Sequence, residues 1–181
     1  MKRSLINQQG NFTVEFAIVG VFFALLLVFS ADIVVKLAYK GKLDRMSYSA
    51  VSIIKERTEL AGADNFGLRP DDQQNNSQGE AAQLYNIVLA SLKRTSGSFD
   101  DQKFGFQLHV VRNGVNIILP YRRGIDCESR GPDKELDFIT TFGRHATLYQ
   151  VTLCYDTPSW FGQLIGQDFS RVSSRSVTMG R

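Results

Sequence analysis

An acidic side chain stands at the start of the most apolar segment of the chain. Glu15 is followed by sixteen uncharged residues, 16–31, of which fourteen are apolar. A carboxylate costs about 2.5–3.5 kcal/mol at the centre of a bilayer and less near its surface, so a membrane segment that carries one generally uses it. Gly10 lies five positions earlier in the chain.

The chain has two cysteines, Cys127 and Cys154. In an oxidising compartment two cysteines predict one disulfide, and the alternative is a pair of separate buried thiols. A bridge that closes a loop of about 27 residues would stabilise the fold by about 3.5 kcal/mol in the chain-entropy model. It would tie the loop 124–131 to a strand that carries Cys154.

No residue pattern indicates an enzyme. The sequence lacks Cys-x-x-Cys, His-Glu-x-x-His and Gly-x-Ser-x-Gly motifs and a glycine-rich phosphate loop. His109 and His145 therefore favour structural or surface roles, and Asp71 and Asp72 lack the ligand spacing of a calcium loop. We predict no catalytic residues, no cofactor and no metal site.

The overall composition conceals the N-terminal segment. The 181 residues are 43% hydrophobic and carry a net charge of +3, with a mean hydropathy of -0.14, values that suit a soluble domain. The mixed signs of the charges give no basic face, which argues against nucleic acid as a partner. One domain behind one membrane segment is the organisation that the sequence predicts.

Three interpretations of the N-terminus compete. Residues 11–35 would span roughly 37 Å as a helix, enough for a permanent membrane anchor. A secretory signal peptide cleaved after Ser30 is the second interpretation, but Glu15 stands where such a peptide prefers no acid. The third is cleavage after Gly10 with the apolar helix retained.

The residues around Glu15 resemble a known processing site. A short basic leader that ends in Gly10, followed by an apolar segment with Glu as its fifth residue, resembles the prepilin site of type IV pilus subunits, where a membrane aspartyl peptidase cuts after the glycine. Asn11 after the cut and the pair Glu15-Phe16 are more similar to the tight adherence (Tad) pilus group. The continuation through residues 22–49 resembles the TadF minor pilins. This resemblance covers residues 1 to about 60 well and the remainder only in layout.

The resemblance implies a function and a set of partners. It implies a minor pilin or pseudopilin that is needed for assembly of an adhesive Tad pilus, in which Glu15 and Phe16 mediate assembly. Gly10 has no side chain and would let the peptidase approach the backbone. Cleavage between Gly10 and Asn11 would create an ammonium group with which the Glu15 of a neighbouring chain could pair. The implied partners are the prepilin peptidase, TadE-like sister minor pilins, the major pilin, an inner-membrane assembly platform and membrane lipid. The alternative is an uncleaved bitopic inner-membrane protein with an extracytoplasmic binding domain. A secreted hydrolase is the third possibility.

The distribution of basic residues conflicts with the expected orientation. Prepilins keep the leader in the cytosol, yet the leader carries only Lys2 and Arg3, against four basic residues within 36–45. Counts alone favour the reverse orientation. The rule that basic residues stay in the cytoplasm is weaker for long translocated domains, and the cysteines favour export. We therefore expect a cytoplasmic N-terminus and a periplasmic domain. Incorporation into the surface pilus would be a further step.

Hydrophobic periodicity predicts two helices. The first runs from Asn11 to about Leu60 without a proline, and an exposed turn at 39–42 is the alternative within it. Gly79 ends a polar segment, 62–79, that we expect to be a mobile loop. A second helix follows over 80–94. The apolar stripes assigned to these helices contain Leu43, Met46, Ala50, Ile53 and Leu60 in the first, and Ala81, Leu84, Ile87, Val88, Ser91 and Leu92 in the second.

Alternating residues predict an antiparallel sheet of about four strands. A hairpin over 104–119 turns at Asn113-Gly114, another strand covers 149–155, and a more polar edge strand covers 169–179. A short helix near 134–142 is also expected. The fold class is therefore α+β and pilin-like: a long N-terminal membrane-spanning helix packed on a small antiparallel sheet with a second helix. The expected divisions are a leader at 1–10, an assembly helix at 11–35 and a globular domain at 36–181.

Overall fold

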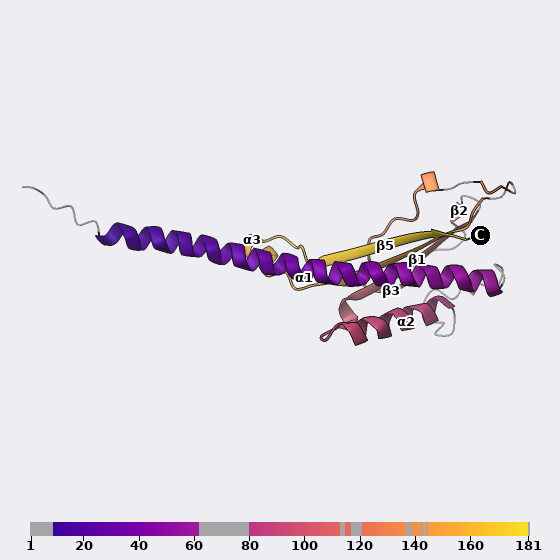
Figure 1. Cartoon of the computed structure of the whole chain (residues 1–181), viewed down its shortest axis with the longest axis horizontal. Coiled ribbons are helices and arrows are strands. Elements are labelled where there is room, and N and C mark those ends of the chain that lie inside the picture. Colours follow the sequence, from indigo (N-terminus) through magenta and orange to yellow (C-terminus); the bar gives the residue numbers. More distant parts are fainter. Residues whose placement is uncertain are drawn as a thin grey trace, which may run out of the picture.

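The computed structural model describes residues 9–61, 80–112, 115–116, 121–136, 139–141, 143 and 145–180. One long helix extends well beyond a small domain that contains the sheet (Figure 1). Most of the expected leader, the expected loop 62–79 and the turn Asn113-Gly114 lie outside the described residues. The α+β, pilin-like fold class predicted from the sequence is confirmed.

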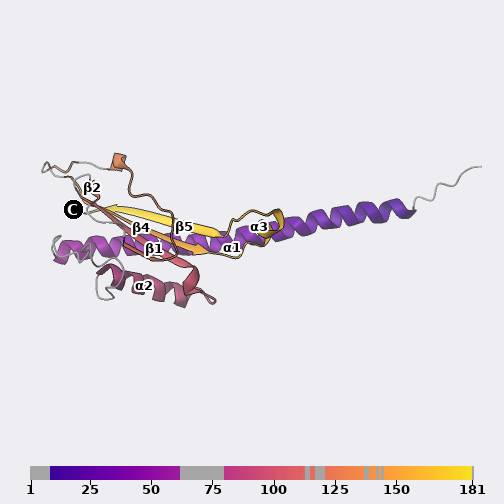
Figure 2. The same cartoon turned by 180° about the vertical axis from the view of Figure 1, so that it is seen from behind.

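Helix α1 covers Gln9–Ala61 without interruption. Its 53 residues correspond to a length of about 80 Å. Gly41 lies inside the helix with no atom near the position of an added Cβ, so the alternative of a turn at 39–42 is wrong. Seen from behind (Figure 2), the sheet and α2 (Glu80–Thr95) lie beside the C-terminal half of α1, and α3 (Trp160–Ile165) lies near its middle.

The sheet has five strands in the described part of the chain. The order β2-β1-β4-β5 is antiparallel throughout, and β3 pairs with the same edge of β1 as β2 does. The strands are β1 (Phe104–Arg112), β2 (Val115–Asn116), β3 (Tyr121–Gly124), β4 (Leu148–Asp156) and β5 (Arg171–Met179).

Three of the predicted strands form as expected, and β5 is an edge strand because it pairs only with β4. Strand β3 was not expected, since Pro120 suggested that pairing ended there. The helix expected over 134–142 is wrong: the described residues hold only a 3-10 turn, η4 (Lys134–Leu136), and a bridge between Ile139 and His145. The remaining helical elements are α2 (Glu80–Thr95), η3 (Asp101–Lys103) and α3 (Trp160–Ile165).

The hydrophobic core lies between the inner face of the sheet and the two longer helices. Alternate residues of β1 and β4 point into it, including Phe106 and Leu153. Of the stripe predicted on α2, Ile87 is exposed, whereas Ala82 is buried. Burial of this apolar surface is the main force that holds the helices on the sheet.

A serine lies at the centre of the buried face of α1. The buried positions are Leu43, Ser47, Ala50, Val51 and Ile54, whereas the predicted Ile53 is partly exposed. These positions follow the i, i+4, i+7, i+8 and i+11 spacing of one helical face. The predicted stripe shares Leu43 and Ala50 with this face, and Met46 packs against the core, but the stripe omits the polar Ser47.

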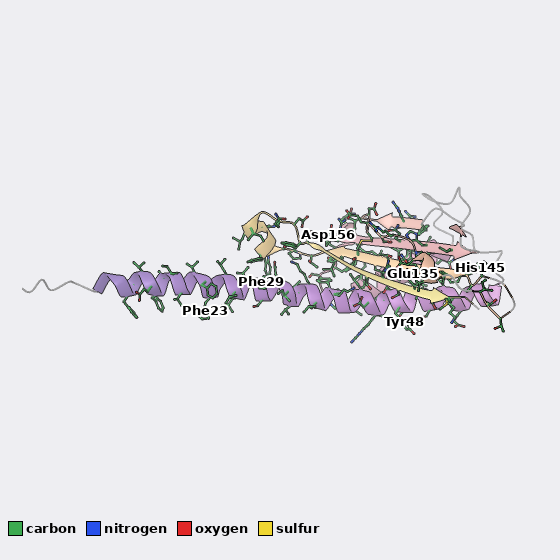
Figure 3. All side chains as sticks on the ribbon, turned by 90° about the horizontal axis from the view of Figure 1, so that it is seen from above. Phe23, Phe29, Tyr48, Glu135, His145 and Asp156 are labelled. Atoms are coloured by element: carbon green, nitrogen blue, oxygen red, sulfur yellow. A yellow bond between two sulfur atoms is a disulfide. The ribbon has the colours of Figure 1, made fainter. Side chains whose placement is uncertain are left out.

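Ser47 joins α1 to the edge strand. Its hydroxyl lies 2.9 Å from that of Ser174 and 2.8 Å from that of Ser176, and it donates to the carbonyl oxygen of Asp44. Small hydrogen-bonded side chains let the helix approach β5 closely without leaving buried polar groups unpaired. Tyr48 points away from the sheet (Figure 3).

Replacing Ser47 with leucine is expected to lower the free energy of unfolding by about 1–3 kcal/mol, because the larger side chain overpacks the contact and removes the hydrogen bonds to Ser174 and Ser176. Ser49→Leu is the matched control, because Ser49 is exposed on the same helix. It should change stability by less than about 0.5 kcal/mol. Denaturant unfolding followed by circular dichroism measures both variants, and equal effects would contradict the assigned contact.

Candidate assembly helix and its junction with the domain

The N-terminal half of α1 exposes apolar side chains on every side. Between Phe12 and Ala31 every residue except Val28 is exposed, and Val28 is half-buried. Such a surface is not stable in water and needs lipid or other protein chains around it. Within the described residues, α1 is the one helix long and apolar enough to cross a membrane.

The predicted processing and assembly residues lie at the free end of this helix. Gly10 and Asn11 fall in its first turn, where backbone N–H groups have no partner within the helix. Glu15 is exposed on the same end, and Phe16 is exposed and stacks on Phe12 with ring centroids 6.5 Å apart. The pairing expected for Glu15 involves a second chain and stays a prediction.

Asp32 lies at the junction between α1 and the domain. Its side chain is buried, and its two carboxylate oxygens accept hydrogen bonds from the backbone N–H groups of Trp160, at 3.2 Å, and Phe161, at 2.9 Å. These are the first N–H groups of α3, which a carboxylate stabilises through hydrogen bonding and the helix dipole. Asp32 therefore caps a helix that is distant in sequence.

Two further contacts complete this junction. Lys36 Nζ lies 3.7 Å from Asp32 Oδ2 and donates to Ser159 Oγ at 3.4 Å. The ring of Phe29 meets that of Phe161 edge to face at 4.9 Å between centroids, and Phe29 lies beneath α3 in Figure 3. A buried carboxylate is tolerated here because it is hydrogen-bonded and paired.

The sequence prediction did not assign Asp32 a role. The available signal was its position as the first charge after the apolar segment, with Lys36 four residues later on the same face of the helix. That pattern indicates an ion pair between Asp32 and Lys36. It does not indicate that Asp32 caps α3, because α3 lies more than a hundred residues away along the chain.

The predicted disulfide is present on the outer face of the sheet. Cys127 and Cys154 are bonded, and the bridge fixes the segment after β3 to β4. Gly105 on β1 lies opposite Cys154. A Cβ at Gly105 would approach the carbonyl oxygen of Ile125 to 2.3 Å and both sulfur atoms to 2.8 Å or less, so glycine is what lets the bridge cross this strand.

The bridged segment covers a polar outer face. Gln150 donates to the carbonyl oxygen of Arg130 at 2.7 Å, and Thr152 donates to Ser129 Oγ at 3.0 Å. The hydroxyl of Ser129 also lies 3.4 Å from His109 Nε2. The side chains of Gln150, Thr152 and His109 are buried, so the disulfide and these hydrogen bonds together hold the segment on the sheet.

Acidification is expected to destabilise the domain through His109. Burial, and secondarily the positive charge of Arg122, lower the pKa of His109 below its ordinary value of 6.5. As the pH falls, His109 takes up a proton in the unfolded chain before it does so in the folded domain. The contribution of His109 to the free energy of unfolding is therefore complete above pH 6.5 and is lost as the pH drops through the folded-state pKa. Denaturant unfolding midpoints measured across this pH range give the dependence of stability on pH. His109→Gln should remove this dependence, whereas the control His145→Gln should retain it.

No group of three or more His, Cys, Asp or Glu side chains in the described residues could hold a metal ion. The chemically distinctive positions are the exposed helix, its capped junction and the disulfide. A long exposed apolar helix joined to a small α+β domain defines the pilin-like class of membrane-anchored proteins.

Comparison with known families identifies the group within that class. The model of the family TadF, "Putative tight adherence pilin protein F", matches residues 4–181. The chain therefore belongs to the TadF family, and the match extends through the domain, beyond the segment that carried the resemblance in the sequence. No curated protein and no solved structure matches the chain.

Proposed function

We propose that this chain is a minor pilin of a Tad-type adhesive pilus, made as a prepilin and cut after Gly10. After cleavage, α1 holds the subunit in the bacterial inner membrane with the domain in the periplasm, and the subunit then joins or primes the fibre. Membership in the TadF pilin family supports a Tad pilus role. Its function in this proposal is assembly and not catalysis.

One observation carries the proposal. In the half of α1 that follows Gly10, every residue from Phe12 to Leu27 is exposed, and Phe29 packs on Phe161 of the domain. A helix of this kind is covered by lipid before assembly and by the helices of other subunits afterwards. The same surface thus serves both stages.

Glu15 gives the exposed helix a specific role in the proposal. A membrane segment that carries a carboxylate generally uses it. In the proposal Glu15 pairs with the new N-terminal ammonium of a neighbouring subunit, at its Asn11, and this pair fixes the axial register of the two helices. Sister TadE-like pilins, the major pilin and the inner-membrane platform are the proposed assembly partners, and the prepilin peptidase acts before them.

The proposed orientation is compatible with the basic residues after the apolar segment. Lys40 pairs with Asp44 at 2.9 Å and donates to the carbonyl oxygen of Ser173, and Lys42 donates to Ser96. These lysines are part of the folded domain, and long domains are translocated largely regardless of charge. Their excess over the leader therefore does not oppose export.

The N-terminal residue of the membrane-extracted protein tests processing. Intact mass and N-terminal sequencing should show a chain that begins at Asn11 in cells with the peptidase and at Met1 in cells without it. A start at Met1 in both strains would favour the uncleaved bitopic alternative. A start at Ala31 would instead show a cleaved signal peptide.

Glu15→Ala is expected to leave cleavage after Gly10 largely intact and to abolish or strongly reduce surface pili, because the proposed role of the carboxylate is to pair with a neighbouring subunit during assembly. Sheared pilus yield and the mass of the membrane-bound chain measure the two effects separately. Thr13→Ala is the matched control, since Thr13 is an exposed polar residue on the same end of α1. Wild-type pilus yield with Glu15→Ala would overturn the role of the carboxylate.

A further inference from the structure

Helix α3 and the residues after it expose a cluster of large apolar side chains. Trp160, Leu164, Ile165 and Phe169 are each more than half exposed, at 53%, 63%, 51% and 52%. Gln163 and Gln167 between them are also exposed. We call these four apolar residues the foot of the domain. Surfaces in contact with water rarely expose several large apolar side chains side by side, so this cluster indicates an interaction site.

The foot lies at the end of the domain that faces the apolar half of α1. In Figures 1 and 2, α3 stands closer to the free end of α1 than any strand does. Phe161 packs on Phe29, Asp32 caps α3, and Lys36 Nζ lies 5.9 Å from the centre of the Phe169 ring. The foot is therefore level with residues 29–36, where the uncharged segment ends.

We propose that the foot inserts into the headgroup region of the bilayer that α1 spans, and that it sets the depth of α1. This inference rests on the membrane location proposed above. The occupant is a lipid surface because the apolar surface of the foot adjoins the exposed surface of α1, which carries no charge between Glu15 and Asp32, and the hydroxyl of Ser30 in this stretch donates to the carbonyl oxygen of Leu26. Tryptophan and amphipathic helices favour this boundary, where an apolar side chain and a polar end are both satisfied.

The level of the foot agrees with the thickness of a bilayer. With Asp32 at one surface, Phe12 lies about 30 Å lower along a straight helix, which matches a hydrocarbon core of about 30 Å. Glu15 then lies about 25 Å below Asp32, close enough to the opposite surface for its carboxylate to reach water. The bond after Gly10 falls just outside the hydrocarbon.

The junction explains how the foot keeps this depth. The Asp32 carboxylate holds the first turn of α3, so α3 cannot slide along α1 without losing two charge-assisted hydrogen bonds. Lys36 neutralises that carboxylate. The charges of Asp32 and Lys36 are therefore paired within the protein, and the carboxylate of Asp168, which is exposed beside Phe169, accepts a hydrogen bond from the backbone N–H of Ser170. The foot presents its apolar side chains outward.

Trp160 provides the probe, because the chain has one tryptophan. The full chain is reconstituted in vesicles of phosphatidylcholine and phosphatidylglycerol. Lipids brominated near the headgroup end of the acyl chain should quench Trp160 emission more than lipids brominated near the methyl end. The double variant Leu164→Asp/Ile165→Asp should lose most of this quenching. Ile139→Asp is the matched control, since Ile139 is 64% exposed outside the foot, and it should keep the quenching.

Two measurements separate the outcomes. Protease protection shows whether α1 spans the vesicle, so loss of insertion would count against the membrane location itself, whereas insertion without quenching of Trp160 would overturn only the foot. Dilution of the chain in lipid should leave the quenching unchanged. Quenching that changes with protein density would assign the foot to a second copy of the chain and contradict the proposal. Each variant should keep the Cys127–Cys154 disulfide and the circular dichroism spectrum of the wild-type chain, which shows that it folds.

Discussion

Replacing Cys127 with serine and Cys154 with alanine is expected to lower the free energy of unfolding of the domain by about 3.5 kcal/mol in the chain-entropy model. The bridge closes a 27-residue separation, and without it the unfolded chain gains conformational freedom. The segment that covers the buried polar face then depends on a few hydrogen bonds, such as the one from Gln150 to Arg130. Denaturant unfolding of the full chain in detergent measures the loss.

Reduction of the wild-type chain is the control for this prediction. A reductant should shift the wild-type unfolding curve to that of the double variant and should leave the double variant unchanged. Single substitutions should resemble the double variant, because either one removes the bridge. A change below about 1 kcal/mol on reduction would contradict a stabilising role for the disulfide.

Asp32→Ala is expected to release α3 from α1. The substitution removes the acceptor for the N–H groups of Trp160 and Phe161 and the partner of Lys36. Hydrogen-exchange protection of these two amides should fall by a factor of about ten to a hundred, because both bonds end on a charged acceptor. The local opening should leave the exchange of β4, at the centre of the sheet, unchanged.

Two variants define the origin of this effect. Asp32→Asn keeps a side-chain oxygen that can accept one of the bonds, and its loss of protection should be intermediate. Asp44→Ala removes an exposed aspartate that also pairs with a lysine one turn away, and it should leave α3 protected. If Asp44→Ala exposed the α3 amides as much as Asp32→Ala did, the cap would not be what holds α3.

The sequence predicted the parts of the fold that depend on local periodicity. Alternation over 104–111 and 149–155 identified β1 and β4, since one face of each strand had to be apolar. The polar character of residues 169–179 correctly indicated an edge strand. The sequence did not predict strand β3, because its four residues show no clear alternation of apolar and polar side chains. This strand forms because it pairs with β1.

The errors within the helices have a common cause. Apolar residues such as Ile53 and Ile87 were assigned to the core by type, yet both are partly exposed, and Ser47 is fully buried. Periodicity alone cannot identify a buried face whose central residue is polar. Ser47 is buried because Ser174 and Ser176 of β5 bring hydroxyl groups to it, and no local sequence feature contains that partnership.

Composition and residue spacing are enough to predict a long apolar helix with an acid near its start, followed by an α+β domain with two cysteines, because these signals act over short stretches of chain. They do not reveal that Asp32 caps α3, that Gly105 makes room for the disulfide, or that the apolar residues of α3 lie level with the end of the uncharged segment. Each of these depends on groups far apart in sequence, which come together only when burial of the core has packed the domain onto α1.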